Sequence, residues 1–208
     1  IVRMMKIIDK AMKIFSVKEG VILFLCVFCM QLVCFAENKP NSKFGGVQIG
    51  TITYSYRSMP DQSLPAILDY IVQSGISSVE LMGEPVEKYA GIPNSRDRES
   101  LKKWRSSVSM DKFKEIRKMF DEKGVEIHIL KLGDHRWSDA EIDYAFEVAN
   151  VLGAKGISME ISEEADQRME PFAEKHQMYV IFHNHFQPAE PTFSFDKILA
   201  YGPMIMLN

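Results

Sequence analysis

The sequence predicts an α/β fold built around a parallel β-sheet. Short apolar runs of strand length alternate with longer stretches in which apolar residues recur at helical spacing, and several of these stretches end at a glycine. The alternation continues from residue 37 to Asn208. Strands that are separated by helices form right-handed βαβ units, and such units build a parallel sheet.

Six apolar runs are predicted strands, and five amphipathic stretches are predicted helices. The strands are 47–54, 76–82, 125–130, 156–161, 179–183 and 204–207. The helices are 64–72, 113–120, 142–149, 165–176 and 195–201. Gly75, Gly124 and Gly153 follow the first three helices as stop signals, and Ser138 with Glu141 has the form of a capping box before the third helix.

A closed barrel explains this pattern better than an open doubly wound sheet. An open nucleotide-binding sheet usually carries a glycine-rich turn after its first strand, whereas residues 53–57 contain no glycine. A complete (β/α)8 TIM barrel takes eight strands and roughly 250 residues. The sequence offers about five and a half βα units, so we expect an incomplete (β/α)8 TIM barrel whose last two to three strands lie beyond Asn208.

Residues 1–36 are interpreted as a secretory signal peptide. Lys13 and Lys18 precede an apolar run over 21–34, and the small residue Ala36 stands at the expected cleavage point. The run falls short of the roughly 20 apolar residues that cross a bilayer, although an uncleaved N-terminal anchor is the alternative. We therefore expect residues 37–208 to form the mature domain, exported to the periplasm and without stable membrane association after cleavage.

The composition of the mature part excludes several classes of protein. The three cysteines, Cys26, Cys29 and Cys34, all lie in the signal peptide, which leaves no disulfide and no thiol nucleophile. The chain has 25 basic and 28 acidic residues; the signal peptide takes five basic and two acidic ones, which leaves 20 against 26. This acidity argues against a nucleic-acid partner. The acidic residues within 163–174 are interpreted as a solvated helix face.

Chemistry in (β/α) barrels collects at the C-terminal ends of the strands, so polar residues there are candidate site residues. His183 and His185 close the fifth predicted strand, and residues two apart on an extended chain share a face. Both imidazoles are therefore expected at the barrel mouth, where such a pair suits a divalent metal or proton transfer. The alternative is that one of them is a hydrogen-bonded rim histidine.

Glu160 is expected to face the barrel interior, because Ile157, Met159 and Ile161 alternate with it toward the helices. A carboxylate in that interior needs a cation or a proton partner, since a buried unpaired charge is costly. An ion pair with Lys131 is the structural alternative.

Four further residues are candidates for binding a substrate. They are Glu80 at the end of the second strand, His128 and Lys131 on the third strand, and Tyr54 at the end of the first. Glu80 is alternatively a hydrogen-bonding rim residue, and Tyr54 is alternatively a packing residue.

The chain resembles a known family in five short motifs that occur in the family's order. They are GVQIG and YSYR within 46–57, GISSVELMG at 75–83, LGA at 152–154 before the strand that ends in Glu160, and AEKH at 173–176 before the run His183-Asn184-His185. These motifs look like those of the sugar phosphate isomerase/epimerase family, one of the xylose isomerase-like barrels. The resemblance covers nearly all of residues 37–208.

This resemblance implies a divalent metal ion (Mn, Mg, Co or Zn) held on late strands, and a proton that moves through an enediolate. The family's first metal-binding Glu corresponds to His183, and His binds the same metals and also acts as a base. We therefore expect His183 and Glu160 as metal ligands, and His185 and Glu160 as catalytic residues. The family's Asp-x-x-His motif is expected beyond Asn208, so this chain is not expected to be competent alone.

Three functions remain open on this basis. The first is metal-dependent isomerisation or epimerisation of a small-molecule sugar by removal of the proton next to a carbonyl. The second is a lyase or hydrolase of 3-keto sugars or glycosides, which needs the same proton abstraction. The third is a non-catalytic, exported sugar-binding protein.

Overall fold

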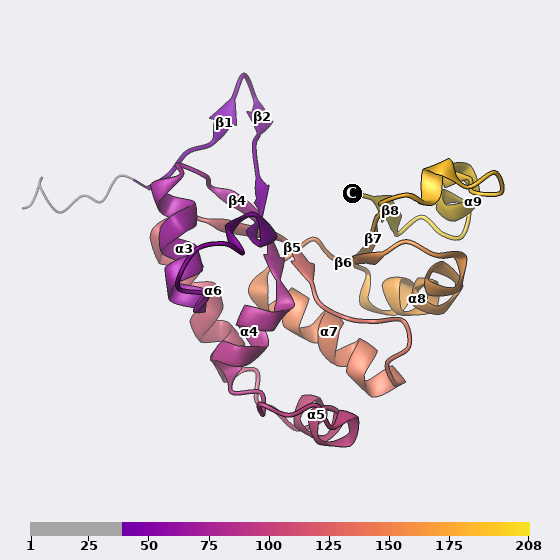
Figure 1. Cartoon of the computed structure of the whole chain (residues 1–208), viewed down its shortest axis with the longest axis horizontal. Coiled ribbons are helices and arrows are strands. Elements are labelled where there is room, and N and C mark those ends of the chain that lie inside the picture. The colour runs from indigo at the N-terminus through magenta and orange to yellow at the C-terminus, as the bar shows by residue number, and fades with distance from the viewer. Residues whose placement is uncertain (1–38) are drawn as a thin grey trace, which may run out of the picture. The chain divides into compact units, whose positions relative to one another are not determined.

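A six-stranded parallel sheet is the centre of the structure, a computed structural model that describes residues 39–208. The sheet has the strand order β3-β4-β5-β6-β7-β8, and Figure 1 shows helices alternating with these strands along the chain. The predicted signal peptide and its cleavage point at Ala36 lie outside the described residues.

The strands of the sheet follow one another in sequence order. They are β3 (Thr51–Ile52), β4 (Ser78–Met82), β5 (Glu126–Lys131), β6 (Gly156–Glu160), β7 (Tyr179–His183) and β8 (Ile205–Leu207). The last five confirm the predicted strands to within two residues at each end. Every neighbouring pair is parallel, as βαβ connections require.

Helices fill the connections between the strands. They are α3 (Leu64–Gln73), α4 (Gly83–Ala90), α5 (Arg98–Arg105), α6 (Asp111–Lys123), α7 (Asp139–Leu152), α8 (Glu163–His176) and α9 (Phe195–Leu199), with the 3-10 turns η1 (Thr53–Tyr56) and η2 (Gln187–Ala189). The capping box of Ser138 and Glu141 opens α7, and Gly153 ends it with positive φ. No helix within residues 39–208 is long and apolar enough to cross a membrane.

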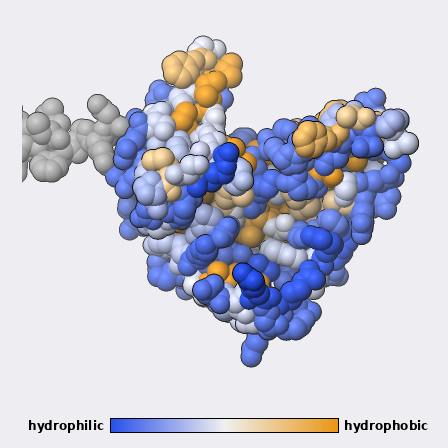
Figure 2. Space-filling view, viewed as in Figure 1, coloured by the Kyte–Doolittle hydropathy of each residue, from blue (hydrophilic) through white to orange (hydrophobic). Residues whose placement is uncertain are grey.

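The first predicted strand is wrong over most of its length. Val47–Gln48 (β2) turns back and pairs antiparallel with Lys43–Phe44 (β1) instead of entering the sheet. The turn between them is formed by Gly45 and Gly46, whose φ angles of +56° and +86° suit the tightest hairpin turns. Figure 2 shows apolar surface on this hairpin. Only the short strand β3 remains to join the sheet.

The apolar core lies between the sheet and the helices. Ile157, Met159 and Ile161 are buried in it, as predicted. Because side chains alternate along a strand, Ser158 and Glu160 lie on the opposite, inner face of the sheet. The polar side chains of β6 therefore lie inside the arc of strands, and its apolar side chains lie outside it.

Two side-chain hydrogen bonds show that the sheet curls. Ser158 Oγ on β6 donates to Glu80 Oε1 on β4 at 2.5 Å, and Asn208 Nδ2, just after β8, donates to Glu80 Oε2 at 2.7 Å. Since β4 and β8 are four strand spacings apart, a flat sheet would separate them by about 19 Å. Side chains cannot meet across that distance. The sheet is bent into an arc, and the prediction of an incomplete (β/α)8 TIM barrel is confirmed.

Candidate functional site

Three predicted site residues meet at the C-terminal ends of β5 to β7. Lys131 Nζ lies 2.8 Å from Glu160 Oε1, and His185 Nε2 lies 3.0 Å from Glu160 Oε2. The side chains of Glu160 and His185 are about half exposed, whereas that of Lys131 is 20% exposed. The ion pair with Lys131, which was the structural alternative for Glu160, is therefore present, and it coexists with a contact to His185.

Two opposing effects act on the Glu160 carboxyl. Partial burial raises its pKa, but the hydrogen bond and charge of Lys131, together with His185 and His183, lower it more. The net result is a pKa below the ordinary value, so Glu160 is ionised at neutral pH. A carboxylate of this kind is a weak base for a carbon-bound proton, and it is well suited to orient a neighbouring group.

His183 stands beside His185 and completes a strand-end cluster of Lys131, Glu160, His183 and His185. The two rings meet edge to face with their centroids 4.7 Å apart. The backbone N–H of His185 donates to Gln187 Oε1 at 2.6 Å, which holds the residues after β7 in a turn. His183 lines the cavity inside the sheet and His185 does not. The two imidazoles are thus adjacent, but they face different spaces.

A cavity of about 410 Å³ lies inside the arc of the sheet. Its polar lining residues are Gln48, Thr51, Ser78, Glu80, His128, His183 and Asn208. Glu80 is buried, and its two oxygens already accept hydrogen bonds from Ser158 and Asn208. The hydrogen-bonding alternative for Glu80 is therefore present in the structure, while Glu80 still lines the cavity.

His128 occupies an irregularity in β5. Val79 pairs with Ile127 and Glu80 pairs with Ile129, which leaves His128 as the extra residue opposite β4. Such a bulge interrupts the alternation of side chains between the two faces of a strand and redirects one of them. The His128 side chain accordingly lines the cavity.

Tyr54 lies in η1, away from the cavity lining. Its side chain is exposed, and the guanidinium of Arg57 lies 4.6 Å from the centre of its ring. Tyr54 is therefore neither a core packing residue nor a wall of the cavity.

The strand-end cluster does not by itself fit a divalent metal. Among residues 39–208, no group of three or more His, Cys, Asp or Glu side chains is placed to hold a metal ion. Both oxygens of Glu160 are engaged, and the ammonium of Lys131 lies where a cation would approach the carboxylate. Metal binding by His183 and Glu160 stays a prediction.

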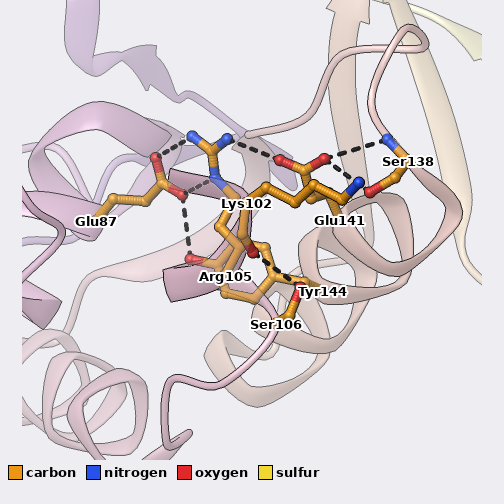
Figure 3. Close-up of polar contacts among 7 residues, drawn as sticks. All are labelled: Glu87, Lys102, Arg105, Ser106, Ser138, Glu141 and Tyr144. Carbon is orange, nitrogen blue, oxygen red and sulfur yellow. Dashed lines mark hydrogen bonds and ion pairs between the residues drawn. The ribbon is translucent and has the colours of Figure 1, made fainter. Parts of the chain in front are cut away.

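A second acid–base cluster, which the sequence did not reveal, joins α4, α5 and α7 (Figure 3). Arg105 donates to both oxygens of Glu87 at 2.8 and 3.1 Å and to Glu141 Oε1 at 3.2 Å. Tyr144 Oη donates to Glu87, and Ser138 Oγ donates to Glu141. The three charged side chains are only 8–11% exposed. We call these five residues the Arg105 cluster.

Asp166 corrects the interpretation of 163–174 as a wholly solvated face. It is fully buried on α8, and neither carboxylate oxygen has a hydrogen-bond partner among the described residues. It shares the core-facing side of the helix with Met169 and Ala173, which helical periodicity places three and seven residues further on. Burial, followed by the charges of Glu163 and Glu170, raises the pKa of Asp166 to about 7.

Solved structures with the same arrangement of strands and helices include three bacterial proteins. A sugar phosphate isomerase/epimerase from Parabacteroides distasonis is 16% identical with a TM-score of 0.52, over 81% of this chain and 69% of that one. The similarity establishes the fold. An uncharacterised protein from the same organism is 22% identical with a TM-score of 0.51, over 73% of this chain and 57% of that one.

The third similar structure is described as a probable 3-DHS dehydratase, AsbF, involved in petrobactin synthesis in Bacillus anthracis. It is 16% identical with a TM-score of 0.52, over 78% of this chain and 62% of that one. The chain thus spans 57–69% of the length of these three structures. No family model and no curated protein matches the sequence.

Proposed function

We propose that this chain belongs to a carbohydrate-processing barrel enzyme that isomerises or epimerises a sugar by removing the proton next to a carbonyl. The observation that carries the proposal is the strand-end cluster, in which one carboxylate holds both a histidine and a lysine at the face where barrel enzymes place their chemistry. The fold shared with a sugar phosphate isomerase/epimerase supports the substrate class.

His185 is the base in this proposal, and Glu160 positions it. The contact of Nε2 with the Glu160 carboxylate favours the tautomer in which Nε2 carries the proton. Nδ1 then keeps a free lone pair, and it can accept a proton from the carbon next to a sugar carbonyl. The negative charge of Glu160 also stabilises the imidazolium that forms.

Lys131 supplies the positive charge that the reaction needs. Removal of the α proton leaves an enolate, whose oxygen is stabilised by a cation already held in place. Lys131 is fixed by Glu160 and is mostly buried, so little reorganisation is required. Return of the proton from His185 to the former carbonyl carbon, together with transfer of the neighbouring hydroxyl proton to the enolate oxygen, gives the isomer. Delivery of a proton from water to the opposite face of the α carbon gives the epimer.

A lyase reaction on a 3-keto sugar is the second candidate, and the position of Lys131 favours it specifically. The first step is the same proton abstraction, after which an ammonium beside the enolate can protonate the departing oxygen group. A divalent metal, held in part by His183 and Glu160, stays a prediction for a more complete barrel.

Hydrogen exchange tests the proposed function before any product is known. The full chain is incubated in D₂O with ketoses, aldoses and 3-keto sugars, and loss of the α-proton signal is followed by NMR. We expect exchange with at least one sugar, and His185→Ala should slow it by about 10²–10⁴-fold. Isomer, epimer or elimination product then distinguishes the two candidate reactions.

The matched control uses a second exposed carboxylate that is paired with a lysine. Glu84 lies 2.7 Å from Lys88 on α4, outside the site. Glu160→Gln should slow exchange and Glu84→Gln should leave it unchanged. Absence of exchange with every sugar, or equal rates in wild type and His185→Ala, would sink the proposal.

Export is a separate proposal that is supported by the pattern of residues 1–36. N-terminal sequencing of protein from the periplasm should begin at Glu37, immediately after Ala36. Recovery of the uncleaved chain in the membrane fraction would contradict it.

A further inference from the structure

A second hollow of about 520 Å³ lies between α5 and the residues that lead into α7. Its lining shares no residue with the cavity inside the sheet. One wall is a face of α5, and the other is the loop Arg136-Trp137-Ser138. The hollow is therefore a distinct feature, and what it binds can be inferred separately from the proposed function.

Positive charge dominates this hollow. Arg98, Lys102 and Arg105 recur at positions i, i+4 and i+7 of α5, so they lie along one face of the helix, and Arg136 faces them from the loop. Figure 2 shows hydrophilic surface over this part of the molecule. Four of the lining residues are cations, whereas only two are acidic.

The ion pairs around the hollow leave two of the cations available. Arg105 is neutralised by Glu87 and Glu141, and Arg136 is paired with Asp134. By contrast, the described part of the chain gives neither Arg98 nor Lys102 an acidic partner. Of the two acidic lining residues, Glu141 is already bonded to Arg105 and Ser138. Glu99 is therefore the acidic lining residue whose charge opposes those of Arg98 and Lys102.

The walls of the hollow are tied together by contacts of Arg105 and are partly apolar. Arg105 stacks on Trp137, with Cζ 3.9 Å from the ring centre, and its ion pairs tie α5 to α7. Leu101 and Trp137 add apolar surface to the lining beside the charges of Arg98 and Lys102. A surface of this kind suits a ligand that has both an oxyanion and a carbon framework, because the cations bind the former and the ring packs against the latter.

We propose that this hollow binds a small organic anion through a phosphate or carboxylate group held by Arg98 and Lys102. Arg98 offers a planar fork of donors that matches either oxyanion, and Lys102 adds a second charge one helical turn away. Trp137 and Leu101 contact the organic part of the ligand. Since exposed charges carry the binding, added salt weakens it.

Tryptophan fluorescence and calorimetry of the full chain test this site. The probes are glucose 6-phosphate, glucuronate and inorganic phosphate, with glucose as the neutral control. We expect saturable binding of glucose 6-phosphate or glucuronate with a change in Trp137 fluorescence, weaker binding of inorganic phosphate, and none of glucose. The relative affinity of the first two distinguishes a phosphate from a carboxylate as the natural group.

Single charge removals on α5 decide whether the hollow is responsible. Arg98→Ala and Lys102→Ala should each weaken binding by about tenfold or more, since a charge-assisted hydrogen bond contributes on that scale. Lys103→Ala is the matched control, because Lys103 is an exposed cation of the same helix that does not line the hollow. Trp104→Phe removes the neighbouring tryptophan and should leave the fluorescence response intact.

Two results would overturn the proposal. One is the absence of saturable binding of all three anions. The other is binding that Lys103→Ala weakens as much as Arg98→Ala and Lys102→Ala do, which would indicate a general attraction to the charge of α5.

Discussion

The Arg105 cluster and the strand-end cluster are built from the same kinds of group, but they occupy opposite environments. In the Arg105 cluster every charged side chain is at most 11% exposed, and each carboxylate is held by Arg105 and by a hydroxyl donor. In the strand-end cluster Glu160 and His185 are more than half exposed. The difference teaches that a buried cluster whose carboxylates all have hydrogen-bond partners is structural. A cluster whose side chains are exposed can still react with a ligand.

The energetic consequences of the two environments differ as well. Removing one partner from a buried ion pair leaves the other charge buried and alone, which costs about 3–5 kcal/mol. An exposed pair contributes about 0–1 kcal/mol, because water solvates either partner when the other is removed. Stability measurements can therefore separate the clusters without an activity assay.

The largest effect is expected for Arg105→Met. The substitution leaves Glu87 and Glu141 buried without their cation, so the free energy of unfolding should fall by about 3–5 kcal/mol. Urea denaturation followed by circular dichroism measures it. Arg96→Met is the control, because Arg96 is exposed in the loop before α5 and should change stability little. A loss below about 1 kcal/mol for Arg105→Met would contradict the structural role of the cluster.

Asp166 sharpens the comparison, because it is buried with no partner at all. Its pKa of about 7 in the folded chain is above the ordinary value of 3.8, so below about pH 4 it is protonated whether the chain is folded or unfolded. As pH rises from there to about 7, the folded chain binds more protons than the unfolded chain, and stability falls by up to about 1.4 kcal/mol per pH unit. Above about pH 7 this group causes no further change.

Asp166→Asn should remove that loss, because the amide stays neutral. The variant should be more stable than wild type at about pH 8, and the difference should shrink steadily toward about pH 4. Denaturation curves across this range measure the difference. Asp69→Asn, on the exposed face of α3, is the control and should show no such trend. A pH-independent difference for Asp166→Asn would contradict the raised pKa, because it would mean that the pKa of Asp166 is the same in the folded and unfolded chains.

The smallest stability effect is expected at Glu160. Glu160→Gln should change the free energy of unfolding by less than about 1 kcal/mol, as Glu84→Gln should. Lys131→Met should nevertheless raise the pKa of Glu160, because the hydrogen bond and charge of Lys131 are the leading causes that lower it. Carbon-detected NMR titration of the Glu160 carboxyl measures this shift. An unchanged or lower pKa would place Lys131 away from Glu160 in solution.

Local signals in the sequence predicted most of the sheet and the larger helices. The capping box of Ser138, the stop at Gly153 and the alternation around Glu160 are contained in short stretches of chain, and each is present in the structure. The ion pair of Glu160 with Lys131 is the structural alternative to a functional role, and it follows from the neighbouring positions of β5 and β6 in the sheet. What these signals determine is which face of an element is buried.

The remaining features depend on residues that are far apart in the sequence. Arg105 is 18 residues from Glu87 and 36 from Glu141, and no periodicity marks the three as partners. α5 is charged along most of its length, so no apolar repeat predicts it. Gly45 and Gly46 are the exception, since a glycine pair between two short extended segments is a local hairpin signal.

Glu80 on β4 links strands of the arc that are not its neighbours in the sheet. Its carboxylate accepts one hydrogen bond from Ser158 on β6 and one from Asn208 just after β8, so it connects strands across the inside of the arc. Hydrogen bonds between strands that are not neighbours restrict the curvature of the sheet more than hydrogen bonds between neighbouring strands do. The spacing of the strand ends, and with it the approach of Lys131 and His185 to Glu160, is therefore set partly by a residue that touches none of them.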